Sequence, residues 1–282
     1  MPAKPWKDDP VAWEKLYDDQ HIVSLASLGF PQFERTRIVA EEKPEVFLSL
    51  ESRIQQRWTA FQQENPKAFN SKKNSVRDKE ALDVDGNTLV IRVYESDFAS
   101  LLYNLNRDEA ENSTLDAEQR YFLDNNLHFL GVTGYIGGTF VPMRHGKILH
   151  DKKQKSDLCG KAAGLKLKSG LWELVPSGFV DPGKDCEQAL ASELSQETGL
   201  DYDDDIVFAK PTHMNFSPKY GNCTVIYNLS INPESINNIK CSPEHGRLGW
   251  LNPEWMLDRE NRYIMSPAPL KVIEDLHPEL KQ

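Results

Sequence analysis

Hydrophobic residues recur at intervals of three and four positions in several stretches of the chain, which predicts amphipathic helices there. The clearest stretch spans residues 44–65 and carries Val46, Phe47, Leu50, Ile54, Trp58 and Phe61. Weaker versions lie within residues 8–28 and around Leu270, Ile273 and Leu276. We expect the aromatic side chains of the 44–65 stretch to pack in a core rather than to surround a ligand.

Alternating apolar residues and turn signals predict strands in several other places. Residues 81–94 have the pattern of a hairpin, with Asp85-Gly86-Asn87 at its turn. Paired strands are predicted over 127–141 and single strands over 206–209, 223–231 and 247–251, with a short helix over 96–104. The polar stretches 106–119, 152–170 and 213–220 are predicted as loops.

One further stretch combines a strand, a Pro/Gly loop and a helix. Residues 185–198 are predicted as the helix, with Asp185 at its N-cap and Gly199 at its C-terminal stop. Cys186, Leu190 and Leu194 then form an apolar stripe. Glu193 and Glu197, four residues apart, lie on a neighbouring stripe with Gln196 between them. The helix therefore brings two carboxylates and one amide together.

Two carboxylates on one helix face have two readings. Like charges four residues apart destabilise a bare helix slightly, and a hard divalent cation that bridges to substrate phosphates would offset this repulsion. An acidic helix face that is simply solvated is the alternative. Helix geometry alone does not separate the two readings.

Composition and charge narrow the class of protein. The chain has 282 residues and a formal net charge of -10, which argues against a nucleic acid duplex or an anionic membrane as the main partner. No two of its four cysteines form a C-x-x-C pair, so reduced thiols are expected. The N-terminus lacks the apolar core of a signal peptide, and residues 129–143 are too short to cross a bilayer. We expect a cytoplasmic protein; a homodimer is compatible with these features.

The spacing from Gly178 to Leu200 resembles the Nudix box, G-x5-E-x7-R-E-U-x-E-E-x-G-U, where U is a bulky aliphatic residue. Residues 170–178 look like the strand that enters this box, and residues 247–255 look like the late strand and helix of the family. The resemblance implies an α/β fold, the Nudix α-β-α sandwich with a mixed sheet, over residues 127–282. A smaller α+β domain is expected over residues 1–126. The box departs from the family at Lys184, Ser192 and Gln196, where the family has Glu, Arg and Glu.

Carried over position by position, the resemblance implies that Glu193 and Glu197 are catalytic and ligate Mg²⁺ or Mn²⁺. Glu193 is also the candidate general base. The carbonyl of Ser177 takes the backbone ligand position, and Gln196 contributes a neutral oxygen. Glu187, near the start of the helix, is a candidate to replace the missing glutamate in part.

Three residues outside the helix receive roles from the same resemblance. Arg144 is predicted to hold a substrate phosphate, and Glu244 to reach the metal from its loop, although a surface carboxylate is the simpler reading of Glu244. Trp172 is a candidate substrate-binding residue, although a tryptophan more often packs in the core. His145 and His213 receive no role.

The function that the resemblance implies is metal-dependent hydrolysis of the diphosphate bond in a nucleoside diphosphate derivative. Several short motifs, among them residues 65–70, 143–145 and 243–245, resemble those of the UDP-glucose and UDP-galactose diphosphatase branch. This resemblance suggests a UDP-sugar as the substrate. The N-terminal region would then set specificity over the nucleotide. The box departures motivate an alternative, a catalytically inactive Nudix fold that binds a nucleotide or a partner.

Overall fold

The computed structural model describes residues 10–28, 33–77, 79–107, 109–136, 140–144, 172, 174–217, 221–240, 245–251 and 253–280. The helices are α1 (Pro10–Asp18), α2 (Glu45–Glu64), α3 (Phe98–Leu105), α4 (Glu109–Ser113), α5 (Ala117–Asn125), α8 (Cys186–Thr198), α9 (Tyr202–Asp205), α10 (Pro253–Leu257) and α11 (Pro267–Leu276). The strands are β1 (His21–Ser24), β2 (Arg35–Ala40), β3 (Lys72–Val76), β4 (Leu82–Asp85), β5 (Thr88–Asp97), β6 (His128–Ile136), β7 (Phe140–Arg144), β8 (Ser177–Phe179), β9 (Ile206–Ser217), β10 (Asn222–Ile231) and β11 (His245–Trp250).

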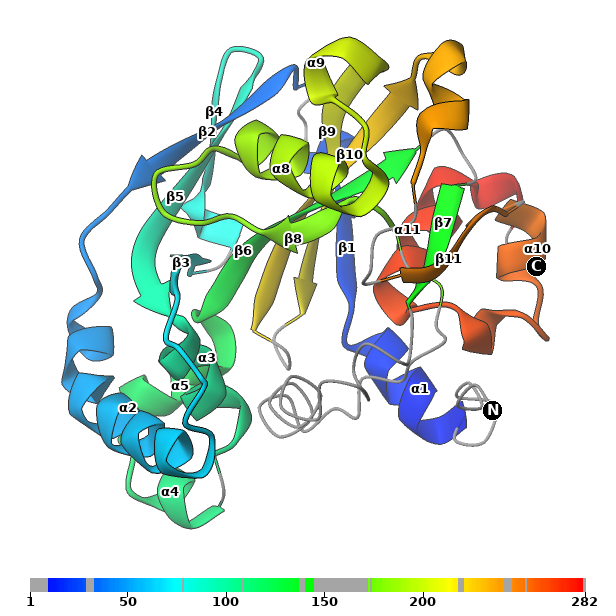
Figure 1. Cartoon of the computed structure of the whole chain (residues 1–282). Coiled ribbons are helices and arrows are strands. Elements are labelled where there is room, and N and C mark those ends of the chain that lie inside the picture. Colours follow the sequence, from blue (N-terminus) through cyan, green and yellow to red (C-terminus); the bar gives the residue numbers. More distant parts are fainter. Residues whose placement is uncertain are drawn as a thin grey trace.

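The described strands join in one mixed sheet in the order β1-β9-β10-β6-β3-β5-β2 (Figure 1). β10 runs parallel to β6, and β2 runs parallel to β5, whereas the other neighbours along this path are antiparallel. β3 and β8 both pair with β6, β3 at His128 and Phe129 and β8 from Gly131 to Thr133. The predicted mixed sheet is thus confirmed.

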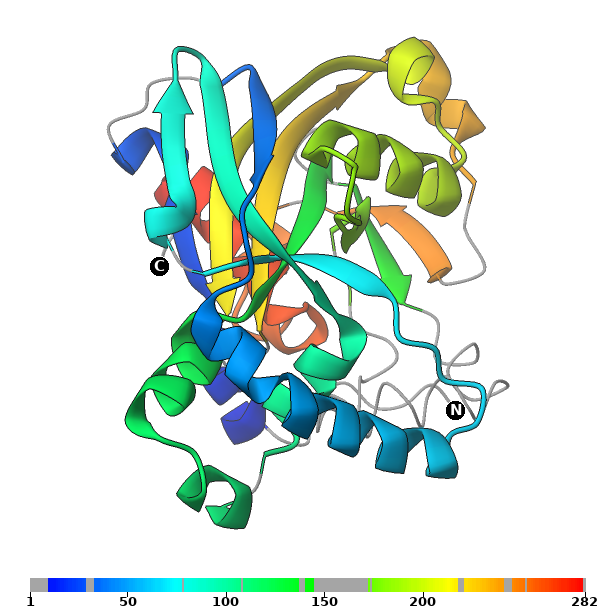
Figure 2. The same ribbon diagram turned by 90° about the vertical axis from the view of Figure 1, so that its left-hand side faces the viewer.

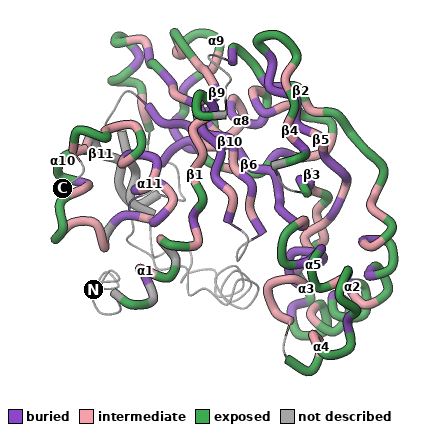
Figure 3. Tube along the Cα trace, turned by 180° about the vertical axis from the view of Figure 1, so that it is seen from behind, coloured by how far each residue is buried: buried purple, intermediate pink, exposed green. Residues whose placement is uncertain are grey.

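Alternation along the central strands places a helical layer on each side of the sheet. Val132 on β6 and Tyr227 on β10 belong to the same buried cluster as Leu190 and Leu194 of α8. Ile226, the neighbour of Tyr227 along β10, belongs to a second cluster with α10 and α11. Figure 2 shows α8 lying over the sheet, and Figure 3 shows the buried trace running through the central strands. The expected α-β-α sandwich is present.

The N-terminal region contributes a third core. Phe47, Leu50, Ile54 and Trp58 of α2 are buried against α3, α5 and the start of β6. The predicted 44–65 helix and the predicted hairpin at Gly86 are confirmed. Strands from both sides of residue 126 nevertheless pair with one another, because β1 pairs with β9 and β3 pairs with β6. The domain boundary itself stays a prediction.

Two predicted loops are wrong. Residues 106–119 include α4 and the start of α5, whose N-cap Asp116 forms a capping box with Gln119. Residues 213–217 continue β9, because the polar side chains of this segment find partners: His213 Nε2 lies 3.0 Å from Asp275 Oδ2, and Asn215 Nδ2 donates to Gln20 Oε1 at 2.9 Å. The predicted loop over 152–170 lies outside the described residues.

Candidate active site

Helix α8 has the ends that its sequence predicts. Asp185 Oδ1 accepts a hydrogen bond from the backbone N–H of Gln188 at 2.7 Å, and Gln188 Oε1 accepts one from the N–H of Asp185 at 3.0 Å. At the other end Gly199 takes the left-handed conformation, with φ of 71°. Cys186, Leu190 and Leu194 are fully buried. These contacts fix the rotation of the helix and therefore the direction of its carboxylates.

Strand β8 presents its outer edge to this helix. The N–H of Gly134 donates to the carbonyl of Pro176, and the N–H of Val180 donates to the carbonyl of Leu130. In an antiparallel ladder such bonded pairs alternate with non-bonded pairs, and Ser177 occupies a non-bonded position opposite Thr133. The N–H and the carbonyl of Ser177 therefore point away from β6, into the space beyond the strand.

Both glutamates of the predicted pair reach this edge. Glu197 Oε2 accepts a hydrogen bond from the Ser177 N–H at 2.9 Å, and Glu197 is only 8% exposed. Glu193 lies against Gly178, so close that a Cβ on Gly178 would stand 2.1 Å from Glu193 Oε1. The structure thus brings Glu193, Glu197 and the Ser177 backbone together.

The three substituted box positions form hydrogen bonds within α8 or within the turn before it. Gln196 is exposed, and its amide Nε2 donates to Ser192 Oγ at 2.8 Å. Ser192 thus bonds to the residue one turn further along the same helix. The N–H of Lys184 donates to the carbonyl of Asp181 in the turn before α8. A ligand role for Gln196 stays a prediction.

Glu187 does not replace the missing glutamate. Its carboxylate accepts hydrogen bonds from the N–H and the hydroxyl of Thr36, both at 2.7 Å, and from the hydroxyl of Tyr227 at 2.9 Å. Thr36 belongs to β2, so Glu187 joins α8 to the N-terminal region. The prediction fails because the half-buried carboxylate of Glu187 needs hydrogen-bond donors, and these come from strands far away in the sequence.

The remaining predicted residues divide into two groups. Trp172 is 5% exposed and packs in the core with Met265, and its carbonyl accepts the Ser266 N–H at 2.7 Å. A ring so enclosed has little face left for a nucleotide base. Arg144 ends β7, but its side chain lies outside the described part, as does Glu244 entirely.

The structure adds residues that the sequence reasoning missed. Lys73 of β3 places its Nζ 2.6 Å from Asp181 Oδ1 and 5.7 Å from the centre of the Phe179 ring. Phe179 is 39% exposed and lies two residues after Ser177. A lysine in a polar N-terminal stretch carries no sequence signal that would connect it with the box.

The oxygen ligands at the edge of β8 suit a hard divalent cation. Two carboxylates with one backbone carbonyl leave room for water and for substrate phosphates, which is how proteins usually bind Mg²⁺. Among the described residues no cluster of three or more Asp, Glu, His or Cys side chains has an arrangement that could hold a metal.

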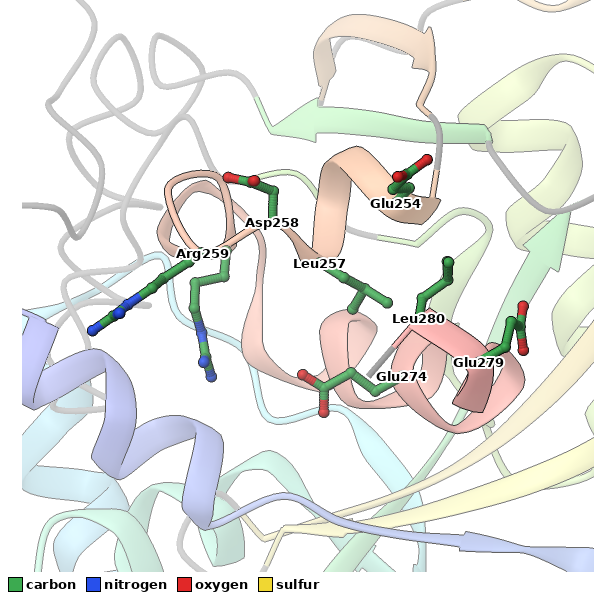
Figure 4. A pocket seen from close by; sticks show the side chains of 8 residues that line it. Glu254, Leu257, Asp258, Arg259, Glu274, Glu279 and Leu280 are labelled. Atoms are coloured by element: carbon green, nitrogen blue, oxygen red, sulfur yellow. The ribbon is translucent and has the colours of Figure 1, made fainter. Parts of the chain in front are cut away.

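A separate cavity of about 810 Å³ lies on the α11 side of the molecule (Figure 4). Its lining includes Glu254, Asp258, Arg259, Arg262 and Glu274. Neither Glu193 nor Glu197 lines it. The described part of the chain also contains no helix long and apolar enough to cross a membrane.

The chain resembles one protein family and several solved structures. Residues 146–275 match the family model of the NUDIX domain. A MutT protein from Methanosarcina mazei is 20% identical, with 54% of this chain and 95% of that one covered and a TM-score of 0.36. A Deinococcus radiodurans protein is 15% identical, with 73% and 98% covered and a TM-score of 0.42.

A third solved structure is described as a bifunctional NMN adenylyltransferase/ADP ribose pyrophosphatase from Francisella tularensis in complex with AMP and a manganese ion. It is 15% identical, with 55% of this chain and 42% of that chain covered and a TM-score of 0.34. No curated protein resembles the chain closely enough to count as a match.

Proposed function

We infer that this chain, which matches the NUDIX domain over residues 146–275, belongs to the Nudix hydrolase superfamily and hydrolyses the diphosphate bond of a nucleotide derivative. The observation that carries the proposal is the convergence of Glu193 and Glu197 on the outer edge of β8. Glu197 is held there by the Ser177 N–H, and the absence of a side chain at Gly178 leaves room for the Glu193 carboxylate.

The residues at this edge have separate tasks in the proposed reaction. Glu193, Glu197 and the carbonyl of Ser177 would hold Mg²⁺ or Mn²⁺. Such an ion neutralises phosphate charge and makes a bound water more acidic. Glu193 accepts the proton of the attacking water at a carboxylate oxygen, and the Ser177 N–H keeps Glu197 in place. Gln196, Arg144 and Glu244 stay predicted contributors.

A UDP-sugar is the substrate that we propose to test first. The short motifs at residues 65–70, 143–145 and 243–245 suggest it, and the strands β1 and β3 of the N-terminal half lie in the same sheet as the site. The products would be UMP and a sugar phosphate.

An inactive nucleotide-binding protein is the second candidate. It is favoured by the bond between Gln196 and Ser192, since these residues occupy two substituted box positions and engage each other. Binding without turnover would identify this case.

A substrate screen decides between the two functions. The purified protein is incubated with UDP-glucose, ADP-ribose and NADH in the presence of Mg²⁺ or Mn²⁺, and the release of a mononucleotide is followed by chromatography. We expect product from at least one substrate. Absence of product from all three, with binding intact in calorimetry, would identify the inactive alternative.

The variant Glu197→Gln tests the site assignment. The amide oxygen can still accept the Ser177 N–H, so the fold should persist, whereas the charge that attracts the metal is lost. Turnover should fall by more than about 100-fold, because loss of an outer-shell partner alone costs about 10- to 100-fold. Glu118→Gln, at an exposed glutamate of α5, is the control. Unchanged turnover in Glu197→Gln would refute the assignment.

A further inference from the structure

Lys73 lies beside the candidate active site although it belongs to the N-terminal half of the chain. Its side chain is 16% exposed, against 47% for its ion-pair partner Asp181. A lysine so enclosed, with its ammonium group near the end of β8, differs from the freely solvated lysines of a protein surface.

The backbone around Lys73 is attached to the same strand. The N–H of Asn74 donates to the carbonyl of Val180 at 3.4 Å, and Asn74 Nδ2 donates to the carbonyl of Asp181 at 3.3 Å. The Phe179 ring under the ammonium group is itself packed edge-on against Phe129, with ring centres 5.8 Å apart. The position of the Lys73 ammonium is therefore fixed relative to β8.

A cation beside this edge would add to the positive charge that binds the substrate phosphates. Ser192, where the family has an arginine, is neutral, while Glu193 and Glu197 are acidic. Phe179 lies roughly 7 Å along the strand from Ser177, since each residue of a strand advances about 3.3 Å. A diphosphate with its nucleoside is long enough to reach from one residue to the other.

We propose that Lys73 binds a phosphate oxygen of the substrate and that Asp181 holds the ammonium group in the free protein. This inference rests on the proposed function for the location of the diphosphate. A phosphate is a stronger partner than a half-exposed carboxylate, because it offers more charge and more acceptor oxygens. The Phe179 ring attracts the ammonium whichever anion it contacts, and so keeps it at the edge of β8 during the exchange.

A purely structural ion pair is the competing explanation. Substituting Lys73 and Asp181 one at a time distinguishes it from phosphate binding. If the pair only fastens β3 to the loop before α8, loss of Lys73 and loss of Asp181 weaken ligand binding alike. If Lys73 binds phosphate, the two substitutions act in opposite directions, because removal of the Asp181 charge frees the ammonium for the ligand.

The experiment measures the binding of inorganic pyrophosphate by calorimetry, without added metal, to the full-length protein and its variants. Lys73→Met should weaken binding about tenfold, which is the usual loss for a hydrogen bond to a charged group. Lys73→Arg should retain affinity within about threefold, and Asp181→Asn should tighten binding. Lys43→Met is the matched control, because Lys43 also pairs with an acid, Glu51 at 2.8 Å, and lies over an aromatic ring, Phe47 at 5.3 Å.

Several outcomes would overturn the proposal. They are unchanged binding in Lys73→Met, equal weakening in Lys73→Met and Asp181→Asn, equal weakening in Lys43→Met, or no pyrophosphate binding by the parent protein. If Lys73→Met does not fold, Asp181→Asn and Lys73→Arg still decide the question. An inactive protein whose pyrophosphate binding depends on Lys73 would refute hydrolysis but not this site. An active enzyme whose pyrophosphate binding does not depend on Lys73 would refute this site but not hydrolysis.

Discussion

Gly178 shows how one missing side chain shapes the candidate site. Glu193 occupies the space that a Cβ would take, at 2.1 Å from the ideal Cβ position. We predict that Gly178→Ala displaces the Glu193 carboxylate, because the end of a flexible side chain moves more easily than backbone. Activity should fall about 100-fold, because misplacing a catalytic group by about 1 Å can lower the rate by that factor. The melting temperature should change little.

Gly86 provides the matched comparison for that prediction. It has a φ of 58° in the β4–β5 turn, and nothing lies within 4 Å of an added Cβ. Gly86→Ala should therefore cost about 1–2 kcal/mol of stability through backbone strain and leave activity unchanged. Thermal unfolding and steady-state kinetics on both variants check the pair. Retained activity in Gly178→Ala would mean that Glu193 does not need its observed position.

At the scale of elements, His213 joins β9 to α11 and makes their contact dependent on pH. Burial lowers the pKa of His213 below its ordinary value of about 6.5, although the hydrogen bond and charge of Asp275 oppose this shift. The folded state then binds a proton less readily than the unfolded state. This contribution to stability is complete above pH ~6.5 and is lost as the pH falls from there towards the pKa of the folded state.

We therefore predict that the protein loses more stability between pH 7.5 and 5.5 than its His213→Gln variant does. Glutamine keeps a donor for Asp275 but does not titrate. Thermal unfolding at the two pH values measures the difference, with His277→Gln as a control at a more exposed histidine. Equal losses in the parent and in His213→Gln would show that His213 does not carry this dependence.

The elements that the sequence predicts correctly are those with local signals. α8 carries its N-cap, its glycine stop and its apolar stripe within the segment itself, so its ends and its buried face follow from the sequence. β9 lacks such signals in its second half, where His213 and Asn215 are polar yet buried. Their partners, Asp275 and Gln20, lie far away in the sequence, and no local pattern predicts that pairing.

The same distinction holds for the candidate site. The choice of Glu193, Glu197 and the Ser177 carbonyl follows from helix spacing and from the resemblance of the box. Lys73 and the engagement of Glu187 with Thr36 do not, because both depend on how the N-terminal strands pack against α8 and β8.

At the scale of the whole molecule, residues on both sides of position 126 share one sheet. We predict that a chain beginning at residue 127 does not fold cooperatively. It would lack β1 and β3, the neighbours of β9 and β6, and would leave the Glu187 carboxylate without both donors from Thr36. Circular dichroism and thermal unfolding of this fragment, with the full chain as reference, test the prediction. A sharp unfolding transition in the fragment would instead support two independent domains.

The pairing of β1 with β9 also bears on how the protein is made. His21 is paired with Phe216, so the first described strand leaves the ribosome long before its partner exists. Until β9 emerges, the N-terminal segment has its backbone donors and acceptors unpaired, and sheets closed by such distant contacts fold slowly. Completion of this sheet therefore waits until β9 has been synthesised, and the nascent chain before that point is the form most exposed to aggregation and to chaperones.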